Sequence, residues 1–248
     1  MSRPIDLVLV PGLLCDSTVW EQQASALRAF TTIQIADHGT LDSLGKMAEA
    51  ILERAPARFA LAGHSMGGRV AFEVLRRAPE RVIAVALMDT AYAPLNPGRD
   101  GLAETSGRYA LLQIARTQGM RTMAAEWVKK MVHPDRLQDA PLIESILAMM
   151  EGKTPDIFSA QIKALLERPD ATSLLAHIRC PALVLCGRQD AWSVLARHEE
   201  MAQRIPNSRL VVIEDCGHMS TMERPEAVTD ALREWLGEVS PQKGTKIT

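Results

Sequence analysis

The most constraining feature of this chain is an alternation of short apolar segments with longer amphipathic ones. Six segments are nearly continuous apolar runs, as expected for strands buried on both faces of a parallel sheet. These predicted strands are Ile5–Val10, Thr32–Ala36, Phe59–Ala62, Val82–Met88, Ala182–Leu185 and Arg209–Ile213. Repeated strand–helix units favour helices on both faces of the sheet. We therefore expect an α/β fold with a mostly parallel sheet of about six strands flanked by helices.

The amphipathic segments between these strands predict helices. They run from Ser17 or Thr18 to about Ala29, from Leu41 to Arg54, from Met66 to Ala78, from Ser193 to Ile205 and from Pro225 to Leu236. Pro79 and Pro206 end two of them, because proline cannot continue a helix. Pro225 falls in the first turn of the last helix, where its missing N–H costs no hydrogen bond.

One long stretch interrupts the alternation. Between residues 97 and 177 no segment has a convincing strand pattern, and the sequence predicts several helices instead. They are Leu102–Thr117, Met120–Met131, Pro141–Glu151, Pro155–Glu167 and a short Ala171–His177. We therefore expect a core of residues 1–96 and 178–239, a helical insertion of residues 97–177, and a polar, disordered tail of residues 240–248.

The composition is that of an ordinary globular protein and argues against several kinds of partner. Hydrophobic residues make up 47% of the chain and charged residues 23%, and the formal net charge is −2. Binding to nucleic acid or to an anionic membrane needs a basic patch, which the sequence lacks. No stretch approaches the length of a membrane span, and the N-terminus lacks a secretory pattern, so we expect a cytoplasmic protein. The sequence gives no indication of the oligomeric state.

The cysteines and histidines lack the spacing of a metal site. Cys15, Cys180, Cys186 and Cys216 are expected to be reduced and mostly buried thiols. The chain also has no glycine-rich loop of the kind that binds phosphate groups. We therefore expect neither a metal nor an organic cofactor.

The strongest chemical signal is the segment Gly63-His64-Ser65-Met66-Gly67-Gly68, which follows a predicted strand and begins a predicted helix. A GxSxG motif in this setting is typical of a nucleophile elbow, a tight turn that lifts a serine hydroxyl above the carboxyl edge of the sheet. The positive end of the following helix lies beside that hydroxyl. Ser65 is therefore the predicted nucleophile.

A serine hydroxyl needs a base, and the base needs an orienting carboxylate. His218 follows the last predicted strand, at the same edge of the sheet as Ser65, and is the preferred base over His38. Asp190 follows the fifth strand and is the preferred carboxylate over Asp89, which follows the fourth. The order Ser65, Asp190, His218 is the chain order of this architecture.

Main-chain N–H groups can stabilise the oxyanion that forms when a serine attacks a carbonyl group. The N–H of Met66, directly after the nucleophile, is one predicted donor. The loop after the first strand, Pro11-Gly12-Leu13-Leu14, supplies the other, and Leu13 is the residue we choose.

These motifs together resemble the α/β-hydrolase superfamily, and specifically its small capped serine esterase-like members. The resemblance covers nearly the whole chain. It rests on Pro11-Gly12 with Trp20 downstream, the elbow at 63–68, Gly187-Arg188-Gln189-Asp190, and Gly217-His218 followed by Glu223-Arg224-Pro225. By this resemblance the helical insertion is a cap over the active site.

The resemblance and the predicted residues lead to one preferred function and several alternatives. We expect hydrolysis of carboxylic esters of small or medium apolar substrates through an acyl-enzyme intermediate. The elbow also resembles that of C–C bond hydrolases of aromatic degradation, and a lactonase would use the same residues. A ligand receptor without catalytic activity on the same scaffold is the non-enzyme alternative.

The substrate pocket is the least defined part of the prediction. The insertion is rich in methionine and aromatic residues, which suit an adaptable apolar pocket but equally suit helix packing. Trp192 and Met219 are further candidates, because they lie close to Asp190 and His218 in sequence. The predicted substrate-binding residues are Trp127, Met131, Met149, Phe158, Trp192 and Met219.

Overall fold

A computed structural model describes residues 4–239 of the chain. Six strands form one sheet: β1 (Ile5–Val10), β2 (Thr31–Ile35), β3 (Phe59–His64), β4 (Val82–Met88), β5 (Ala182–Gly187) and β6 (Ser208–Ile213). Their order is β2-β1-β3-β4-β5-β6, and every neighbouring pair is parallel. The predicted fold class and the six-stranded parallel sheet are confirmed. The predicted tail, residues 240–248, lies outside the described residues.

The helices form two sets. One set alternates with the strands, and the other lies between β4 and β5 in the sequence. The first set is α1 (Glu21–Leu27), α2 (Leu44–Arg54), α3 (Met66–Arg77), α9 (Leu195–Arg204), α10 (Ser220–Glu223) and α11 (Pro225–Val239). The second set is α4 (Arg99–Gln118), α5 (Met120–Val128), α6 (Ala140–Glu151), α7 (Pro155–Leu166) and α8 (Thr172–Leu175). Short 3₁₀ helices occupy Ser17–Trp20, Pro79–Arg81 and Pro134–Gln138.

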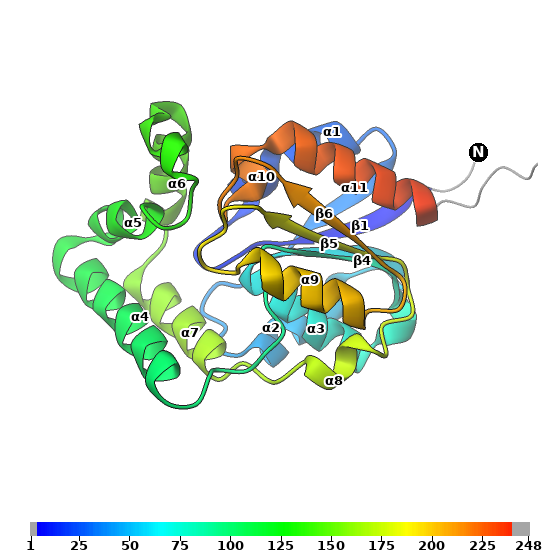
Figure 1. Cartoon of the computed structure of the whole chain (residues 1–248), viewed down its shortest axis with the longest axis horizontal. Helices are drawn as coiled ribbons and strands as arrows, with labels where there is room; N and C mark the ends of the chain where they lie inside the picture. The colour runs from blue at the N-terminus through cyan, green and yellow to red at the C-terminus, as the bar shows by residue number, and fades with distance from the viewer. Residues whose placement is uncertain (1–3, 240–248) are drawn as a thin grey trace, which may run out of the picture.

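Helices cover both faces of the sheet, as Figure 1 shows. Helices α1 and α11 pack together on one face, while α2, α3 and α9 lie on the other. The central strands consist almost entirely of apolar residues because both of their faces are buried. Leu9, Leu61 and Leu87 on β1, β3 and β4 are fully buried. Burial of these apolar side chains is the main favourable contribution to the stability of the core.

The order of the strands reverses between β1 and β3. The chain leaves β1 toward β2 on one side and then continues on the other side with β3. Loops at such a reversal point diverge, which leaves room for a ligand above the sheet. Both the GxSxG turn and the Pro11–Leu14 loop begin at this position.

The insertion, defined as residues 97–177, contains helices but no strand. In Figure 1 its larger helices, α4 to α7, lie beyond the carboxyl ends of the strands. Helices α4, α5 and α6 pack in succession, and α7 packs against α4. The insertion therefore lies at the end of the sheet where the predicted catalytic loops emerge.

Several predicted boundaries differ from the structure. The first helical segment begins as a 3₁₀ turn, and Asp16 rather than Ser17 or Thr18 caps it by accepting the Thr18 N–H. Strands β3 and β5 extend two residues further, to His64 and Gly187, because their pairing with neighbouring strands continues there. The short helix α10 was not predicted, because four residues carry too little periodicity.

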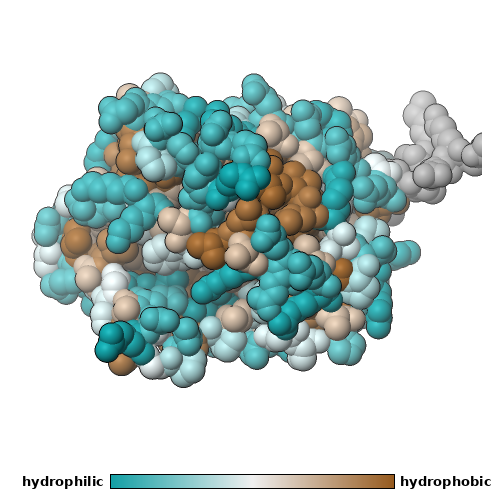
Figure 2. Space-filling view, viewed as in Figure 1, coloured by the Kyte–Doolittle hydropathy of each residue, from teal (hydrophilic) through white to brown (hydrophobic). Residues whose placement is uncertain are grey.

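Strand β6 forms one edge of the sheet and is less buried than the central strands. Figure 2 shows apolar surface in the region where β6 lies between α11 and α9 in the same view. Within residues 4–239, no helix is both long enough and apolar enough to cross a membrane.

Candidate active site

Ser65 occupies the sharp turn between β3 and α3. Its φ and ψ are 55° and −116°, a conformation that side-chain-bearing residues rarely adopt. The Ser65 N–H donates to the carbonyl oxygen of Met88 at 2.8 Å, which continues the pairing of β3 with β4 into the turn. The strained turn is therefore anchored to the central part of the sheet, and the side chain of Ser65 stays partly exposed.

Gly67 explains part of the GxSxG spacing. A Cβ atom at this position would lie 2.1 Å from the carbonyl oxygen of Val10 on the neighbouring strand. No side chain fits there, so the helix can approach β1 closely only with glycine. This approach keeps Ser65 beside the loop that follows β1.

His218 lies in the loop between β6 and α10, and it reaches Ser65. Its Nε2 is 2.8 Å from the Oγ of Ser65, and its Nδ1 is 2.8 Å from the Oδ2 of Asp190. A carboxylate can only accept, so the Nδ1–H donates to Asp190 and leaves Nε2 free to accept the serine proton. The imidazole is itself buried, with 2% of its residue surface exposed.

Asp190, in the loop after β5, is held by its other oxygen. The N–H groups of Trp192 and Ser193 both donate to Oδ1 at 2.8 Å. These bonds fix the carboxylate so that Oδ2 faces His218. The structure thus brings together Ser65, His218 and Asp190, the three residues that the sequence singled out.

The electrostatic surroundings of Asp190 and His218 favour the charged form of each side chain. Burial raises the pKa of Asp190, but the charge and hydrogen bond of His218 outweigh burial, and the net pKa is below the ordinary value. Burial likewise lowers the pKa of His218, but the carboxylates of Asp190, Asp89 and Glu223 raise it above 6.5 overall. The surroundings therefore stabilise an imidazolium at the position of His218.

Asp89 lies close to this pair without bonding to the imidazole. Its Oδ1 accepts the N–H of Gly187 at 3.0 Å, and its Oδ2 accepts the hydroxyl of Ser220. Asp89 is fully buried, and burial together with the charge of Asp190 raises its pKa well above the ordinary value. The structure places Asp190, and not Asp89, against the Nδ1 of His218.

Two other buried histidines, His38 and His64, have different partners. The Nε2 of His38 is 3.3 Å from the carbonyl oxygen of Pro11, and burial lowers the pKa of His38 to about 4. His64 donates from Nε2 to the carbonyl oxygen of His218 at 2.8 Å. Neither ring is hydrogen-bonded to Ser65. His38, the alternative base, thus binds the loop after β1 instead.

The loop after β1 lies directly against Ser65. A Cβ atom on Gly12 would be 3.2 Å from the Cβ of Ser65, so the main chain of this loop passes close to the nucleophile. Among the described residues, the N–H groups of Leu13 and Met66 have no hydrogen-bond acceptor. One main-chain donor of the loop after β1 and one directly after the nucleophile are thus free.

A residue of the insertion supports this loop, and no sequence pattern pointed to it. The Oε1 of Gln161, on α7, accepts the N–H of Leu14 at 2.8 Å, and its Nε2 donates to the carbonyl oxygen of Gly39 at 3.2 Å. Gln161 is 3% exposed, and Leu14 has a positive φ of 58°. Gln161 therefore holds the strained loop from a position that is remote in sequence.

Glu223 is the second residue that sequence reasoning did not identify as part of the site. Its carboxylate accepts the N–H groups of Gly217 and Met219, on either side of His218, at 3.1 Å. Only the Glu-Arg-Pro motif after His218 could have suggested a role. Glu223 lies on α10, the helix too short to be predicted.

The predicted substrate-binding residues have two different environments. Five of them are buried in the hydrophobic core: Trp127, Met131, Met149, Phe158 and Met219. Trp192 is 37% exposed and lines a cavity of about 340 Å³. The other lining residues are Lys129, Lys130, Val132, His133, Pro134, Gln189 and Ala191. The cavity thus borders the loop of Asp190 and the turn that follows α5.

Within the described residues, one group of three side chains could in principle hold a metal ion. Asp89, Cys186 and Asp190 offer ligand atoms within 4.8 Å of one another. Both carboxylates, however, already accept hydrogen bonds from protein groups, and burial raises the pKa of the Cys186 thiol. The four cysteines are free, and burial raises the pKa of Cys15 to about 12. We therefore assign no metal to this group.

Comparisons with known proteins agree with this architecture. A sequence model described as "Alpha/beta hydrolase family" matches residues 7–231. The pimeloyl-[acyl-carrier protein] methyl ester esterase of Nitrosomonas europaea is 28% identical, across 89% of this chain and 91% of the relative. The 3-oxoadipate enol-lactonase 2 of Acinetobacter baylyi is 27% identical, across 77% of this chain and 69% of the relative. The solved structure of a thermophilic esterase from Thermogutta terrifontis is similar with a TM-score of 0.84 and 30% identity, over 97% of this chain and 92% of that chain.

Proposed function

Because the chain belongs to the alpha/beta hydrolase family, we propose that it is a serine esterase that cleaves carboxylic esters through an acyl-enzyme intermediate. Ser65 is the nucleophile, His218 is the general base and acid, and Asp190 orients the imidazole. The N–H groups of Leu13 and Met66 form the oxyanion hole. The insertion is the cap that bounds the substrate site.

In the first half of the reaction, the Oγ of Ser65 attacks the ester carbonyl while Nε2 of His218 takes the serine proton. The resulting oxyanion accepts hydrogen bonds from the two main-chain N–H groups. Asp190 stabilises the imidazolium, consistent with the raised pKa of His218. When the C–O bond to the alcohol breaks, His218 returns its proton to the leaving alkoxide, and an acyl-Ser65 ester remains.

In the second half, His218 takes a proton from water, and the oxygen of that water attacks the acyl-Ser65 carbonyl. The same two N–H groups stabilise the second oxyanion. Collapse of this intermediate releases the carboxylic acid, and the proton held by His218 returns to the Oγ of Ser65. The sum is one ester and one water giving one acid and one alcohol.

One observation carries this proposal. The 2.8 Å contacts from Ser65 to His218 and from His218 to Asp190 link a nucleophile, a base and an orienting carboxylate in a single hydrogen-bonded chain. The names of relatives support the ester as the substrate class, because two of them are described as esterases. An alcohol nucleophile held in this way performs acyl transfer.

The test is hydrolysis of nitrophenyl esters whose acyl chains run from acetate to decanoate, by wild type and Ser65→Ala. We expect multiple turnover by wild type and a loss of roughly 10⁴-fold or more in kcat on removal of the nucleophile. Ser106→Ala, at an exposed position of α4, is the matched control and should retain full activity. Turnover that persists in Ser65→Ala would reject the proposed nucleophile.

A lactone is the second substrate class to include in this test. A lactone is a cyclic ester, and one relative is described as a 3-oxoadipate enol-lactonase. The same oxyanion hole and base would open the ring, and the alcohol would remain attached to the acyl group. Comparison of kcat/KM for γ-lactones and for open-chain esters of similar size distinguishes the two preferences.

A further inference from the structure

The loop that carries His218 is bonded through its main chain to the insertion. The His218 N–H donates to the carbonyl oxygen of Met131 at 2.7 Å, and the Met219 N–H reaches the same oxygen at 3.2 Å. On the opposite side, the carbonyl oxygen of His218 accepts Nε2–H of His64 at 2.8 Å. The two main-chain polar groups of His218 are thus held by different parts of the molecule: the N–H by the insertion and the carbonyl by β3.

Gly217 shows how closely the two segments approach. A Cβ atom on Gly217 would lie 2.6 Å from the N of His133 and 2.6 Å from the carbonyl carbon of Val132. Backbone atoms cannot move aside as a flexible side chain can. The turn at residues 131–133 therefore lies flush against the loop at residues 217–219.

The carboxylate of Glu223 joins these two segments. Its Oε2 accepts the N–H of His133 at 2.7 Å, while its two oxygens accept Gly217 N–H and Met219 N–H at 3.1 Å. Glu223 is 2% exposed, so water does not compete for these bonds. Hydrogen bonds from N–H groups to a carboxylate are stronger than those to a neutral acceptor.

We propose that Glu223 is a positioning residue that couples the insertion to the general base. It holds the 217–219 loop and the 131–133 turn together, so that Nε2 of His218 stays within reach of Ser65 only while the turn is seated on the loop. This inference rests on the proposed function, in which His218 is the base. It assigns to the insertion a part in the chemistry besides enclosing the substrate.

Glu223 also acts on His218 through its charge. The titratable groups that face His218 are Asp190 after β5, Asp89 after β4, His64 on β3, His198 on α9 and Glu223 on α10. The carboxylate of Glu223 contributes to the raised pKa of His218. Removal of this charge should therefore lower that pKa and move the acid limb of the kcat/KM profile to lower pH. A smaller folded fraction alone would scale the profile without moving its limb.

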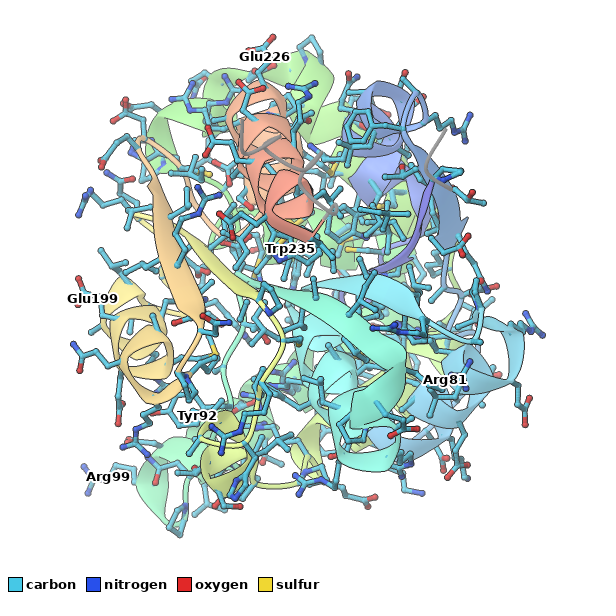
Figure 3. All side chains as sticks on the ribbon, turned by 90° about the vertical axis from the view of Figure 1, so that its right-hand side faces the viewer. Arg81, Tyr92, Arg99, Glu199, Glu226 and Trp235 are labelled. Carbon is cyan, nitrogen blue, oxygen red and sulfur yellow. The ribbon has the colours of Figure 1, made fainter. Side chains whose placement is uncertain are left out.

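The first experiment compares Glu223→Gln with Glu226→Gln, an exposed position at the start of α11 near the edge of the molecule in Figure 3. Glutamine keeps the shape of the Glu223 side chain but replaces one accepting oxygen with an NH₂ group. That group cannot accept the main-chain N–H groups that the carboxylate binds. We expect kcat for nitrophenyl acetate to fall roughly tenfold or more, with a smaller change in KM and an acid limb at lower pH. Glu226→Gln should match wild type in kcat, in KM and in the position of the acid limb.

The second experiment tests the link from the side of the insertion. His133 has a φ of −55° and a ψ of 139°, and proline adopts a φ of about −65°. His133→Pro therefore removes the N–H that binds Glu223 at a φ that proline accepts, while His133→Ala keeps that N–H. Circular dichroism first verifies that both variants are folded. We expect His133→Pro to have the lower kcat of the two.

Hydrogen exchange, measured by mass spectrometry on peptides that contain residues 131–133 and 217–219, gives a readout that needs no substrate. We expect faster exchange in both peptides of Glu223→Gln and no change in those of Glu226→Gln. An unmoved acid limb and unchanged exchange in folded Glu223→Gln would overturn the inference. If wild type cleaves no ester, the proposed function fails, and exchange still decides whether Glu223 holds the loop to the turn.

Discussion

The parallel sheet and the helical insertion contribute different kinds of group to the candidate site. The sheet supplies the reacting side chains, and each of them lies one to five residues beyond the end of a strand, as Ser65, Asp190 and His218 do. The insertion supplies supports instead. Gln161 holds the loop of Leu13, and the carbonyl oxygen of Met131 holds the loop of His218.

This difference has a physical cause. Parallel strands end at the same edge of the sheet, so a side chain just after a strand is placed by local sequence and by strand order together. A helix of the insertion reaches the site only through packing, and any of its faces could make the contact. The reacting groups are therefore set by the sheet, whereas their exact orientation depends on both regions.

Within this comparison, the largest loss of kcat tests the part played by the sheet. It concerns the carboxylates of Asp190 and Asp89. Asp190→Asn removes the acceptor that fixes the tautomer of His218, and we expect kcat to fall roughly 10³–10⁴-fold. Burial and the charge of Asp190 raise the pKa of Asp89 and favour its neutral form. Asparagine resembles that neutral form, so Asp89→Asn should reduce kcat much less than Asp190→Asn does. Ester turnover and thermal unfolding of both variants provide the measurement.

The reverse ranking of these two variants would assign the orienting role to Asp89. Equal losses in kcat would mean that the two carboxylates act as a unit, contrary to the geometry in which only Asp190 contacts Nδ1 of His218.

The next effect tests the insertion. Gln161→Leu leaves the buried N–H of Leu14 without an acceptor, which costs about 1–3 kcal/mol. We expect the strained loop to loosen and kcat/KM for nitrophenyl esters to fall roughly tenfold. Gln113→Leu, at an exposed position of α4 in the same insertion, is the control. If both variants retain the wild-type rate, the support from the insertion is dispensable for catalysis.

The smallest effect is a shift of the pH profile rather than a loss of rate. The neutral imidazole of His218 is the proposed base, and its carboxylate neighbours raise the pKa above 6.5. Activity should therefore be low while His218 is protonated and should rise with pH through this raised pKa. The acid limb of kcat/KM for nitrophenyl acetate in wild type measures this raised pKa. A limb below the ordinary histidine pKa in wild type would contradict the electrostatics of the site.

Much of the fold was predictable because its signals are local. Continuous apolar runs such as Val82–Met88 have the length and composition of buried parallel strands, and the prediction of this strand matches its observed bounds. Helix ends were less certain, as the Asp16 cap shows, because several neighbouring residues could cap the same turn. The substrate-binding residues remain predictions, since methionine and aromatic side chains pack equally well into a core.

The sequence by itself determined the six-stranded parallel sheet, the elbow at Ser65 and the placement of Asp190 and His218 after strands that end at the same edge. These features depend on residue periodicity and on short motifs, which local physics converts directly into structure. Only the tertiary structure decided which carboxylate faces His218 and which residues hold the two loops. Glu223 lies five residues from His218, whereas Met131 and Gln161 come from a distant part of the chain. Contacts of this kind depend on how the helices pack against the sheet, and no local pattern encodes that packing.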